Sequence, residues 1–237
     1  MAQAPGPAVI SLLAPTRGRP SFFGAMLESA FAHPGADIEV VAYVDDDDPA
    51  LELYRTYVSH PSVRLTIGPR IVLSQAWNEC AAVASGEHLM LAADDIRFRH
   101  PGCAGEVERV FGTLPDGIGY LYGRDGHWDH MLGTHGIVSR TWVEVVGYFC
   151  PPHFASDKND AWLHDVARMV GRAIYLPRLY TEHLHPAFGK APQDATHQER
   201  MSRHRAADVD LLYFSMADLR RHDAQKLLDH MLEVGGG

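Results

Sequence analysis

Short apolar runs alternate with amphipathic segments along the first hundred residues. Apolar runs of about 4–8 residues bounded by Pro, Gly or Asp are typical of buried strands, and recurrence at helical spacing is typical of amphipathic helices. Four runs predict strands, at residues 8–15, 38–44, 63–69 and 88–93. Three segments between them predict helices, at residues 21–33, 49–61 and 72–84. This alternation predicts an α/β fold with a mainly parallel central sheet.

Helix boundary signals support this pattern in two places. "PGAD" at residues 34–37 predicts the stop of the first helix, and Ser74 is a candidate N-cap of the third.

Each predicted strand ends in a polar cluster. The clusters read "TRGRP", "DDDDP", "GPR" and "DD" in chain order, and the last one is Asp94 and Asp95. Ligands of parallel α/β sheets bind beyond the carboxyl ends of the strands. We therefore expect the four clusters to meet in one cleft.

The second half of the chain is less regular. Strands and turns are predicted at residues 117–126 and 130–140, and helices at 141–149 and 160–172. The segment 173–185 has strand character on either side of Pro177. From about residue 195 the composition is helical and charged, which predicts C-terminal helices to which no role can be assigned.

Composition and charge narrow the class of protein. The 237 residues carry a formal net charge of −9, which disfavours general attraction to nucleic acid or anionic membranes. Three scattered cysteines indicate a reducing compartment rather than a disulfide framework. No signal peptide or membrane-spanning segment is predicted, so we expect a cytoplasmic protein.

Asp94 and Asp95 raise a question of charge, because adjacent carboxylates at the mouth of a cleft repel each other. A bound cation would relieve the repulsion, and Mg²⁺ or Mn²⁺ commonly bridges carboxylates and substrate phosphates. The alternative is that Asp94 is a turn or N-cap residue and Asp95 is solvated.

The stretch "LSQAWNECAAVASGEHLMLAADDI" resembles the segment that precedes the acidic motif of GT-A-type glycosyltransferases of the family 2 kind. Asn78, Gly86, Glu87 and the terminal Asp pair correspond to that motif. Ala92 stands where the family has its first motif aspartate, so the DxD motif is degenerate. The resemblance implies that Asp94 or Asp95 is a metal ligand, and Asp95 is favoured because it stands at the turn.

The resemblance also implies a donor site at the first three strand ends. "LLAPTRGRP" is similar to the loop that contacts the nucleotide, and "YVDDDDP" to the segment that holds base and ribose. Arg70 is a candidate for the diphosphate or base, with a surface role as the alternative. Asp47 and Asp48 are as well explained by a solvated turn. The residues expected to contact the donor are Pro15, Thr16, Arg17, Asp45, Asp46, Arg70, Asn78 and Asp94.

Two downstream segments complete the resemblance, which covers about residues 8–195. "NDAWLHDVARMVGR" is similar to the family's ED-containing helix, which places Asp160 at the catalytic-base position and Asn159 at the position of the Glu. Asp157 and Asp165 are the competitors for the base. "EHLH" provides His183, or second His185, as a C-terminal metal ligand.

The resemblance implies a GT-A, Rossmann-like catalytic domain at residues 1–195 and a helical extension at 196–237. The nucleotide-sugar half would span about residues 1–100 and the acceptor half about 101–195.

The expected activity is inverting, metal-dependent transfer from a nucleotide-diphosphate sugar, preferably a UDP-sugar, with Mn²⁺ or Mg²⁺. The acceptor would be a hydroxyl of a saccharide or of a hydroxymethylated DNA base. A nucleotidyltransferase, a metal-dependent hydrolase and a non-catalytic nucleotide-sugar-binding module are the alternatives, and the oligomeric state stays open.

Overall fold

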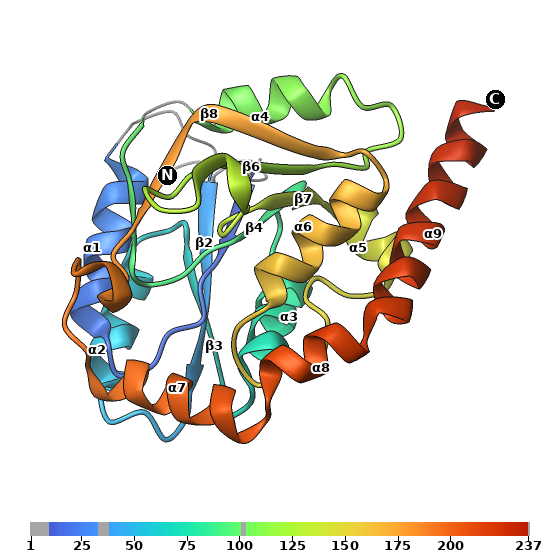
Figure 1. Ribbon diagram of the computed structural model, residues 1–237. Coiled ribbons are helices and arrows are strands. Elements are labelled where there is room, and N and C mark those ends of the chain that lie inside the picture. The colour runs from blue at the N-terminus through green and yellow to red at the C-terminus, as the bar shows by residue number, and fades with distance from the viewer. Residues whose placement is uncertain (1–9, 33–37, 101–102, 237) are drawn as a thin grey trace.

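An eight-stranded sheet forms the centre of the molecule (Figure 1). The computed structural model describes residues 10–32, 38–100 and 103–236. The strand order is β3-β2-β1-β4-β7-β6-β8-β5. The strands are β1 (Ile10–Leu13), β2 (Ile38–Asp45), β3 (Val63–Gly68), β4 (His88–Leu91), β5 (Ile96–Phe98), β6 (Tyr120–Arg124), β7 (Ile137–Ser139) and β8 (Ala173–His183).

The first half of the sheet is parallel, as the strand–helix alternation predicts. β3, β2, β1 and β4 run side by side in one direction. β7 then pairs antiparallel with both β4 and β6, while β8 is parallel to β6 and antiparallel to β5. The mainly parallel α/β sheet expected from the sequence is therefore confirmed.

Helices cover both faces of the sheet and bury two apolar clusters. One cluster includes Trp77, Trp142 and Trp162, on the side of α3, α5, α6 and α9. The other includes Phe23 and Tyr54, on the side of α1 and α2. The helices are α1 (Pro20–Phe31), α2 (Leu51–Thr56), α3 (Leu73–Val83), α4 (Cys103–Phe111), α5 (Arg140–Val146), α6 (Asn159–Met169), α7 (Ala195–Ala206), α8 (Val209–Ser215) and α9 (Ala217–Gly235). Three short 3₁₀ turns lie at Tyr57–Ser59, Asp129–Met131 and Pro186–Phe188.

The C-terminal helices follow the sheet rather than standing apart from it. α9 packs against α5 and α6, and α7 crosses beneath the ends of the parallel strands (Figure 1). Across the described residues, no helix combines the length and the apolar character that a membrane crossing requires.

The structure differs from the predicted elements at four points, one of which is α4 (Cys103–Phe111), a helix that no predicted segment covers. Ser74 is not the N-cap of α3, because Val72 holds that position and Ser74 is buried inside the first turn. β8 runs as one strand through Pro177, which has no backbone N–H to donate and lies where the β6–β8 ladder is irregular. β5 follows the Asp pair directly and was not predicted. The stop at residues 34–37 falls outside the described residues.

Trp77 of α3 ties together the ends of two central strands. Its indole N–H lies 3.1 Å from the carbonyl oxygen of Leu13 and 3.0 Å from that of Ala92. This contact fixes the loop after β1 beside the loop after β4.

Asp125, directly after β6, organises the loop that follows. Its carboxylate is 1% exposed and accepts backbone N–H bonds from His127 at 2.8 Å, Trp128 at 2.7 Å and Asp129 at 3.1 Å. It also accepts the hydroxyl of Thr134 at 3.0 Å. Burial opposes ionisation, but these hydrogen bonds hold the pKa of Asp125 below its usual value.

We expect Asp125→Ala to lower the free energy of unfolding by about 2–4 kcal/mol at pH 7, because several buried donors lose their acceptor. Because the pKa of Asp125 is lower in the folded state, its ionised carboxylate stabilises the fold fully at a pH above the unfolded pKa of about 3.9. This stabilisation is lost as the pH falls through the folded-state pKa. Urea unfolding at pH 7 and pH 3 measures both effects. The exposed Glu233→Ala is the control, and equal losses in the two variants would contradict this role.

Candidate active site

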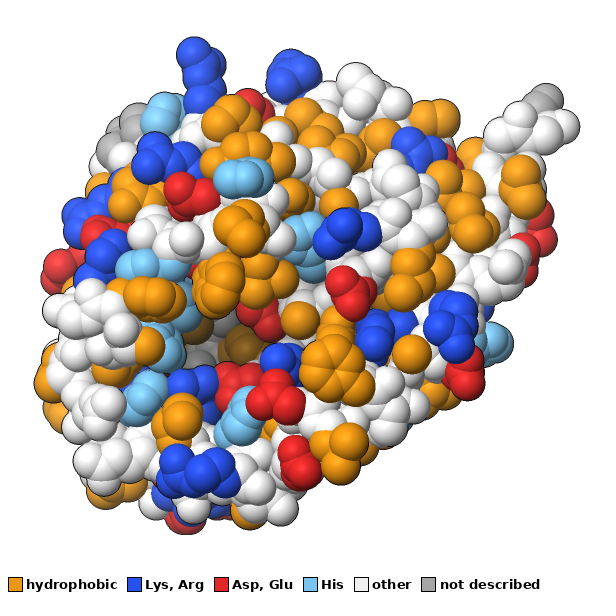
Figure 2. All heavy atoms as spheres, in the orientation of Figure 1, with side chains coloured by type: hydrophobic (Ala, Val, Ile, Leu, Met, Phe, Trp, Pro, Cys, Tyr) orange, Lys and Arg blue, Asp and Glu red, His pale blue; other side chains and the backbone are white. Residues whose placement is uncertain are grey.

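A cavity of about 520 Å³ lies beyond the carboxyl ends of β1 to β4. Residues from all four predicted strand-end clusters line it, as the sequence indicates. The space-filling view shows the hollow, with His, Arg and acidic side chains at its rim (Figure 2). α7 contributes Thr196, His197, Glu199, Arg200 and Arg203 to the lining, so the C-terminal extension takes part in the site.

The first wall of the cavity is formed by the loop after β1, the end of β2 and the loop after β3. Pro15, Thr16, Arg17, Asp45 and Arg70 all line it. The guanidinium of Arg17 donates to Asp45 at 2.8 Å, which joins the two strand ends. Arg70 is paired with Glu199 of α7. These five donor candidates are thus brought together.

Two residues of the expected donor site, Asp46 and Asn78, lie outside the cavity lining. Asp46 is exposed and does not line the cavity. Asn78 lies outside the cavity lining. Its side-chain oxygen accepts the backbone N–H groups of Phe149 and Cys150, and these bonds connect α3 to the chain after α5. The interpretation of Asp48 as a solvated turn residue is wrong. Asp48 is buried and accepts the N–H of Gly18 at 2.8 Å.

Asp94 and Asp95 have different partners although they are adjacent. Asp94 accepts the hydroxyl of Thr16 at 2.7 Å, and burial together with the charge of Asp95 raises its pKa. Asp95 Oδ1 lies 3.5 Å from Nε2 of His183. Burial works against ionisation of Asp95, yet this contact with His183 holds its pKa below the usual value. The ionised member of the pair is therefore the one beside a histidine.

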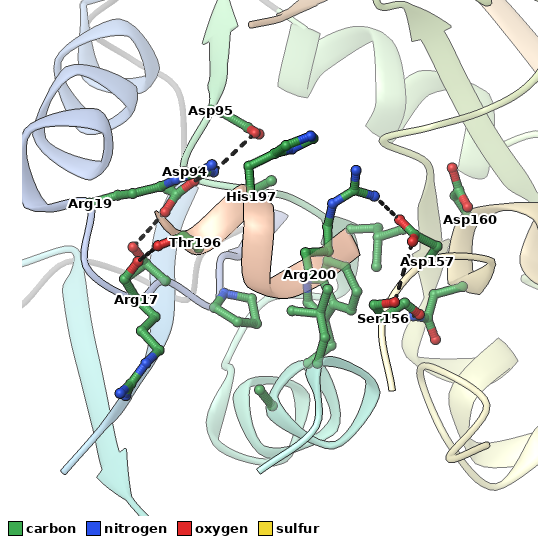
Figure 3. Close-up of a pocket in the computed structure, with 18 of the residues that line it drawn as sticks. Arg17, Arg19, Asp94, Asp95, Ser156, Asp157, Asp160, Thr196, His197 and Arg200 are labelled. Atoms are coloured by element: carbon green, nitrogen blue, oxygen red, sulfur yellow. Dashed lines mark hydrogen bonds and ion pairs between the residues drawn. The ribbon is translucent and has the colours of Figure 1, made fainter. Parts of the chain in front are cut away.

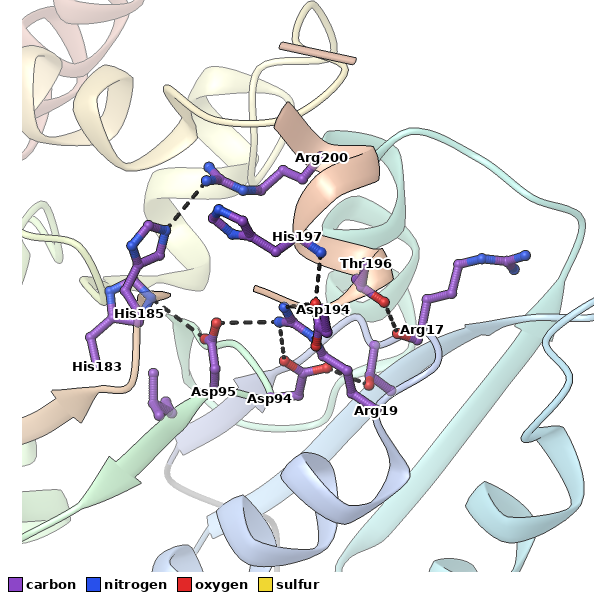
Figure 4. Close-up of polar contacts among 12 residues, drawn as sticks. Arg17, Arg19, Asp94, Asp95, His183, His185, Asp194, Thr196, His197 and Arg200 are labelled. Atoms are coloured by element: carbon purple, nitrogen blue, oxygen red, sulfur yellow. Dashed lines mark hydrogen bonds and ion pairs between the residues drawn. The ribbon is translucent and has the colours of Figure 1, made fainter. Parts of the chain in front are cut away.

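Four imidazoles form a row, and its second member, His183, contacts Asp95. The ring centroids of His135 and His183 are 4.9 Å apart, those of His183 and His185 5.2 Å, and those of His185 and His197 5.2 Å. Burial lowers the pKa of His135 to about 4, and burial and the neighbouring His183 lower that of His185 to about 4. Figure 4 shows His183, at the end of β8, joined to Asp95, with His185 shortly after it and His197 on α7.

The chemistry of this cluster fits a divalent cation. A carboxylate and a neutral imidazole are common ligands of Mn²⁺, and the buried Nε2 of His135 has no hydrogen-bond partner among the described residues. Within residues 10–32, 38–100 and 103–236, no three His, Cys, Asp or Glu side chains form a complete ligand set. Oxygens of a substrate would have to complete the coordination.

Asp160 lies on the wall opposite the Asp pair (Figure 3). Its carboxylate accepts one hydrogen bond in the described structure, from the N–H of Ala161 at 2.8 Å, and burial raises its pKa to about 6. The two competitors are engaged instead. Asp157 binds Arg200 and His204, and Asp165 accepts the hydroxyl of Tyr213.

The turn before α6 orients Asp160. Lys158 adopts a left-handed backbone with φ of 69°, a conformation that is costly for a residue with a side chain. Asn159 is 2% exposed, and its Oδ1 lies 2.9 Å from the hydroxyl of Ser74. Asn159 thus anchors α6 to α3, and Asp160 faces the cavity.

Several residues of the cavity had no predicted role. His135 and His197 belong to the histidine row, and their histidine-rich surroundings were the only signal in the sequence. Arg19 lies in the "TRGRP" loop, and Arg200 lies in the charged C-terminal segment. Their positions depend on contacts between residues far apart in the chain.

Solved structures show similarity over nearly the whole chain. The mannosyltransferase PcManGT from Pyrobaculum calidifontis, in complex with GDP-Man and Mn²⁺, matches with a TM-score of 0.61 and 15% identity. The match covers 98% of this chain and 78% of that one. The fold is GT-A.

A second GT-A structure agrees with the first. S. aureus TarS 1–349 in complex with UDP-GlcNAc matches with a TM-score of 0.56 and 14% identity, covering 94% of this chain and 72% of that one. Against the longer S. aureus TarS structure the match spans 42% of that chain. No protein-family model and no curated protein match in sequence. The GT-A fold expected from the sequence is confirmed by structure alone.

Proposed function

We propose that this protein is an inverting, metal-dependent glycosyltransferase that transfers a sugar from a nucleotide-diphosphate sugar to a hydroxyl. The observation that carries the proposal is the placement of two kinds of carboxylate in one GT-A cavity. Asp94 and Asp95 lie on one wall, and the unpaired Asp160 lies on the opposite wall. Inverting transfer needs a leaving-group side and a base side separated by the sugar.

The nucleotide is assigned to the wall formed by the ends of β1, β2 and β3. Thr16 and Asp45 offer oxygen partners for base and ribose, and Arg17 and Arg70 offer positive charge. PcManGT was solved with GDP-Man and TarS with UDP-GlcNAc, so both nucleotides are candidates here. A UDP-sugar is our first choice.

Asp95 and His183 are assigned as protein ligands of Mn²⁺ or Mg²⁺, with His185 as the next nearest candidate. When bound, the cation supplies positive charge that stabilises the departing diphosphate. PcManGT contains Mn²⁺ in its complex, which supports this assignment. His135 can orient His183 through their ring contact.

Asp160 is assigned as the general base. Its carboxylate takes the proton from the acceptor hydroxyl while that oxygen attacks the anomeric carbon, and the bond to the diphosphate breaks on the opposite face. A carboxyl whose pKa lies near 6 is ionised at neutral pH and is a stronger base than an ordinary aspartate.

The acceptor is assigned to the cavity mouth beside Trp128 and Phe188. Both side chains line the cavity, and they are 46% and 43% exposed. Exposed aromatic faces can stack on a sugar ring or a base, which agrees with a saccharide or a hydroxymethylated DNA base as acceptor.

A thermal-shift panel of UDP- and GDP-sugars with and without Mn²⁺ tests donor binding, because a ligand that binds only the folded state raises its melting temperature. We expect stabilisation by one nucleotide-sugar class, and a larger shift with Mn²⁺. Product analysis then separates the candidates. Transferred sugar supports the proposal, pyrophosphate release indicates a nucleotidyltransferase, and binding without turnover indicates a non-catalytic module.

A further inference from the structure

Arg19 is a partly buried cation between the Asp pair and α7. Its NH1 lies 3.4 Å from Oδ1 of Asp94 and 3.4 Å from Oδ2 of Asp95. The side chain is 11% exposed and lines the cavity. A positive side chain therefore shares the two carboxylates at which the donor's diphosphate would arrive.

The guanidinium of Arg19 is held in a fixed orientation. Its Nε and NH2 donate to the two oxygens of Asp194, both at 2.7 Å. Asp194 is itself the N-cap of α7 and accepts the N–H of His197 at 2.8 Å. The guanidinium also lies 5.6 Å from the ring centroid of Phe22. Figure 4 shows Arg19 between Asp194 and the Asp pair.

This position suits an anion that enters beside two carboxylates. A diphosphate is repelled by Asp94 and Asp95 unless positive charge lies between them. Asp194 holds the Nε–NH2 edge of the guanidinium, and NH1 makes only long contacts of 3.4 Å with the Asp pair. NH1 can therefore turn to a phosphate oxygen, and a pre-oriented guanidinium loses little entropy on binding. Arg19 lies at the required place before any ligand arrives.

We propose that Arg19 binds the diphosphate of the donor and shares the Asp94–Asp95 pair with the metal ion. The inference rests on the proposed function and names a donor-binding residue outside the expected set.

The proposal has two consequences of opposite sign. Loss of Arg19 weakens diphosphate binding, because a charge-assisted contact is removed. The same loss strengthens binding of Mn²⁺ alone, because a positive charge no longer lies 3.4 Å from both carboxylates. A residue that only holds the fold together would not move the two affinities in opposite directions.

The test is calorimetry on Arg19→Gln with three probes: UDP or GDP in the presence of Mn²⁺, the corresponding nucleoside, and MnCl₂ alone. We expect the diphosphate to bind about 10- to 100-fold weaker, the range for a lost charge-assisted hydrogen bond. We expect the nucleoside affinity to be unchanged and Mn²⁺ alone to bind more tightly. Arg19→Lys keeps the positive charge but loses the planar guanidinium, so its diphosphate affinity should lie between those of the wild type and Arg19→Gln. If Arg19→Gln does not fold, the same measurements on Arg19→Lys provide the test.

Asp194→Asn is the matched control, because it weakens the link to α7 and leaves Arg19 beside Asp94 and Asp95. We expect it to lose less diphosphate affinity than Arg19→Gln does, because the positive charge stays in place and only its orientation is loosened. The inference is overturned if Asp194→Asn reproduces the loss, if Arg19→Gln binds the diphosphate as well as the wild type does, or if Mn²⁺ binding weakens. A wild type that binds neither UDP nor GDP would overturn the proposed function, and this inference with it.

Discussion

Asp160→Asn is expected to reduce sugar transfer by ~10²-fold or more, the usual scale for a lost general base. The amide keeps the shape of the carboxylate and its contact with the N–H of Ala161, but it cannot accept the acceptor's proton. Donor and Mn²⁺ affinities should stay near wild type, because Asp160 lies on the wall opposite the Asp pair. Initial rates with saturating donor measure the first effect and calorimetry the second.

The pH dependence gives an independent test of Asp160. Burial raises its pKa to about 6, so kcat/KM should fall as the pH drops through that value, where the base becomes protonated. The remaining activity of Asp160→Asn should lack this step. Turnover at the wild-type rate, or a product that keeps the donor's anomeric configuration, would contradict the assignment and make Asp157 the next candidate.

Asp95→Ala is expected to abolish the metal-dependent part of nucleoside diphosphate binding. Its carboxylate is the ionised member of the pair and the one in contact with His183. Loss of an outer-shell partner typically costs 10- to 100-fold in metal affinity, so loss of a direct ligand should cost about 100-fold or more. Calorimetry of UDP and GDP with Mn²⁺ or with a chelator measures the difference.

Asp94→Ala and Asp46→Ala are the comparisons for this experiment. Asp94 is bonded to Thr16 and should have the smaller effect, and the exposed Asp46 should have almost none. Unchanged metal-dependent affinity in both Asp94→Ala and Asp95→Ala would place the cation elsewhere.

The fold could be predicted because two features of the sequence both indicate a parallel α/β sheet. These are the alternation of apolar runs with amphipathic segments and the polar residues at the strand ends. Buried strands of a parallel sheet are continuous apolar runs, and the polar residues that follow them meet at one edge. Thr16, Asp45, Arg70 and Asp95 could therefore be placed in one cavity without any knowledge of long-range contacts.

What escaped prediction depends on contacts between distant segments. Ser74 looked like a helix cap, but its hydroxyl lies beside Asn159, eighty-five positions along the chain. Asn78 matched the motif, yet its amide serves the backbone at Phe149 and Cys150. No periodicity reveals that Asp194 of the C-terminal segment binds Arg19.

The pairing of β5 with β8 has a consequence for how the length of this chain can vary. Ile96 is opposite His183 in that ladder, and the N–H of Leu184 donates to the carbonyl of Asp95 at 2.8 Å. Asp95 and His183 are thus aligned by backbone register, whatever the length of the chain between them. Insertions in the intervening surface loops should be tolerated, whereas a single added or deleted residue inside β8 would turn the imidazole to the other face of the sheet.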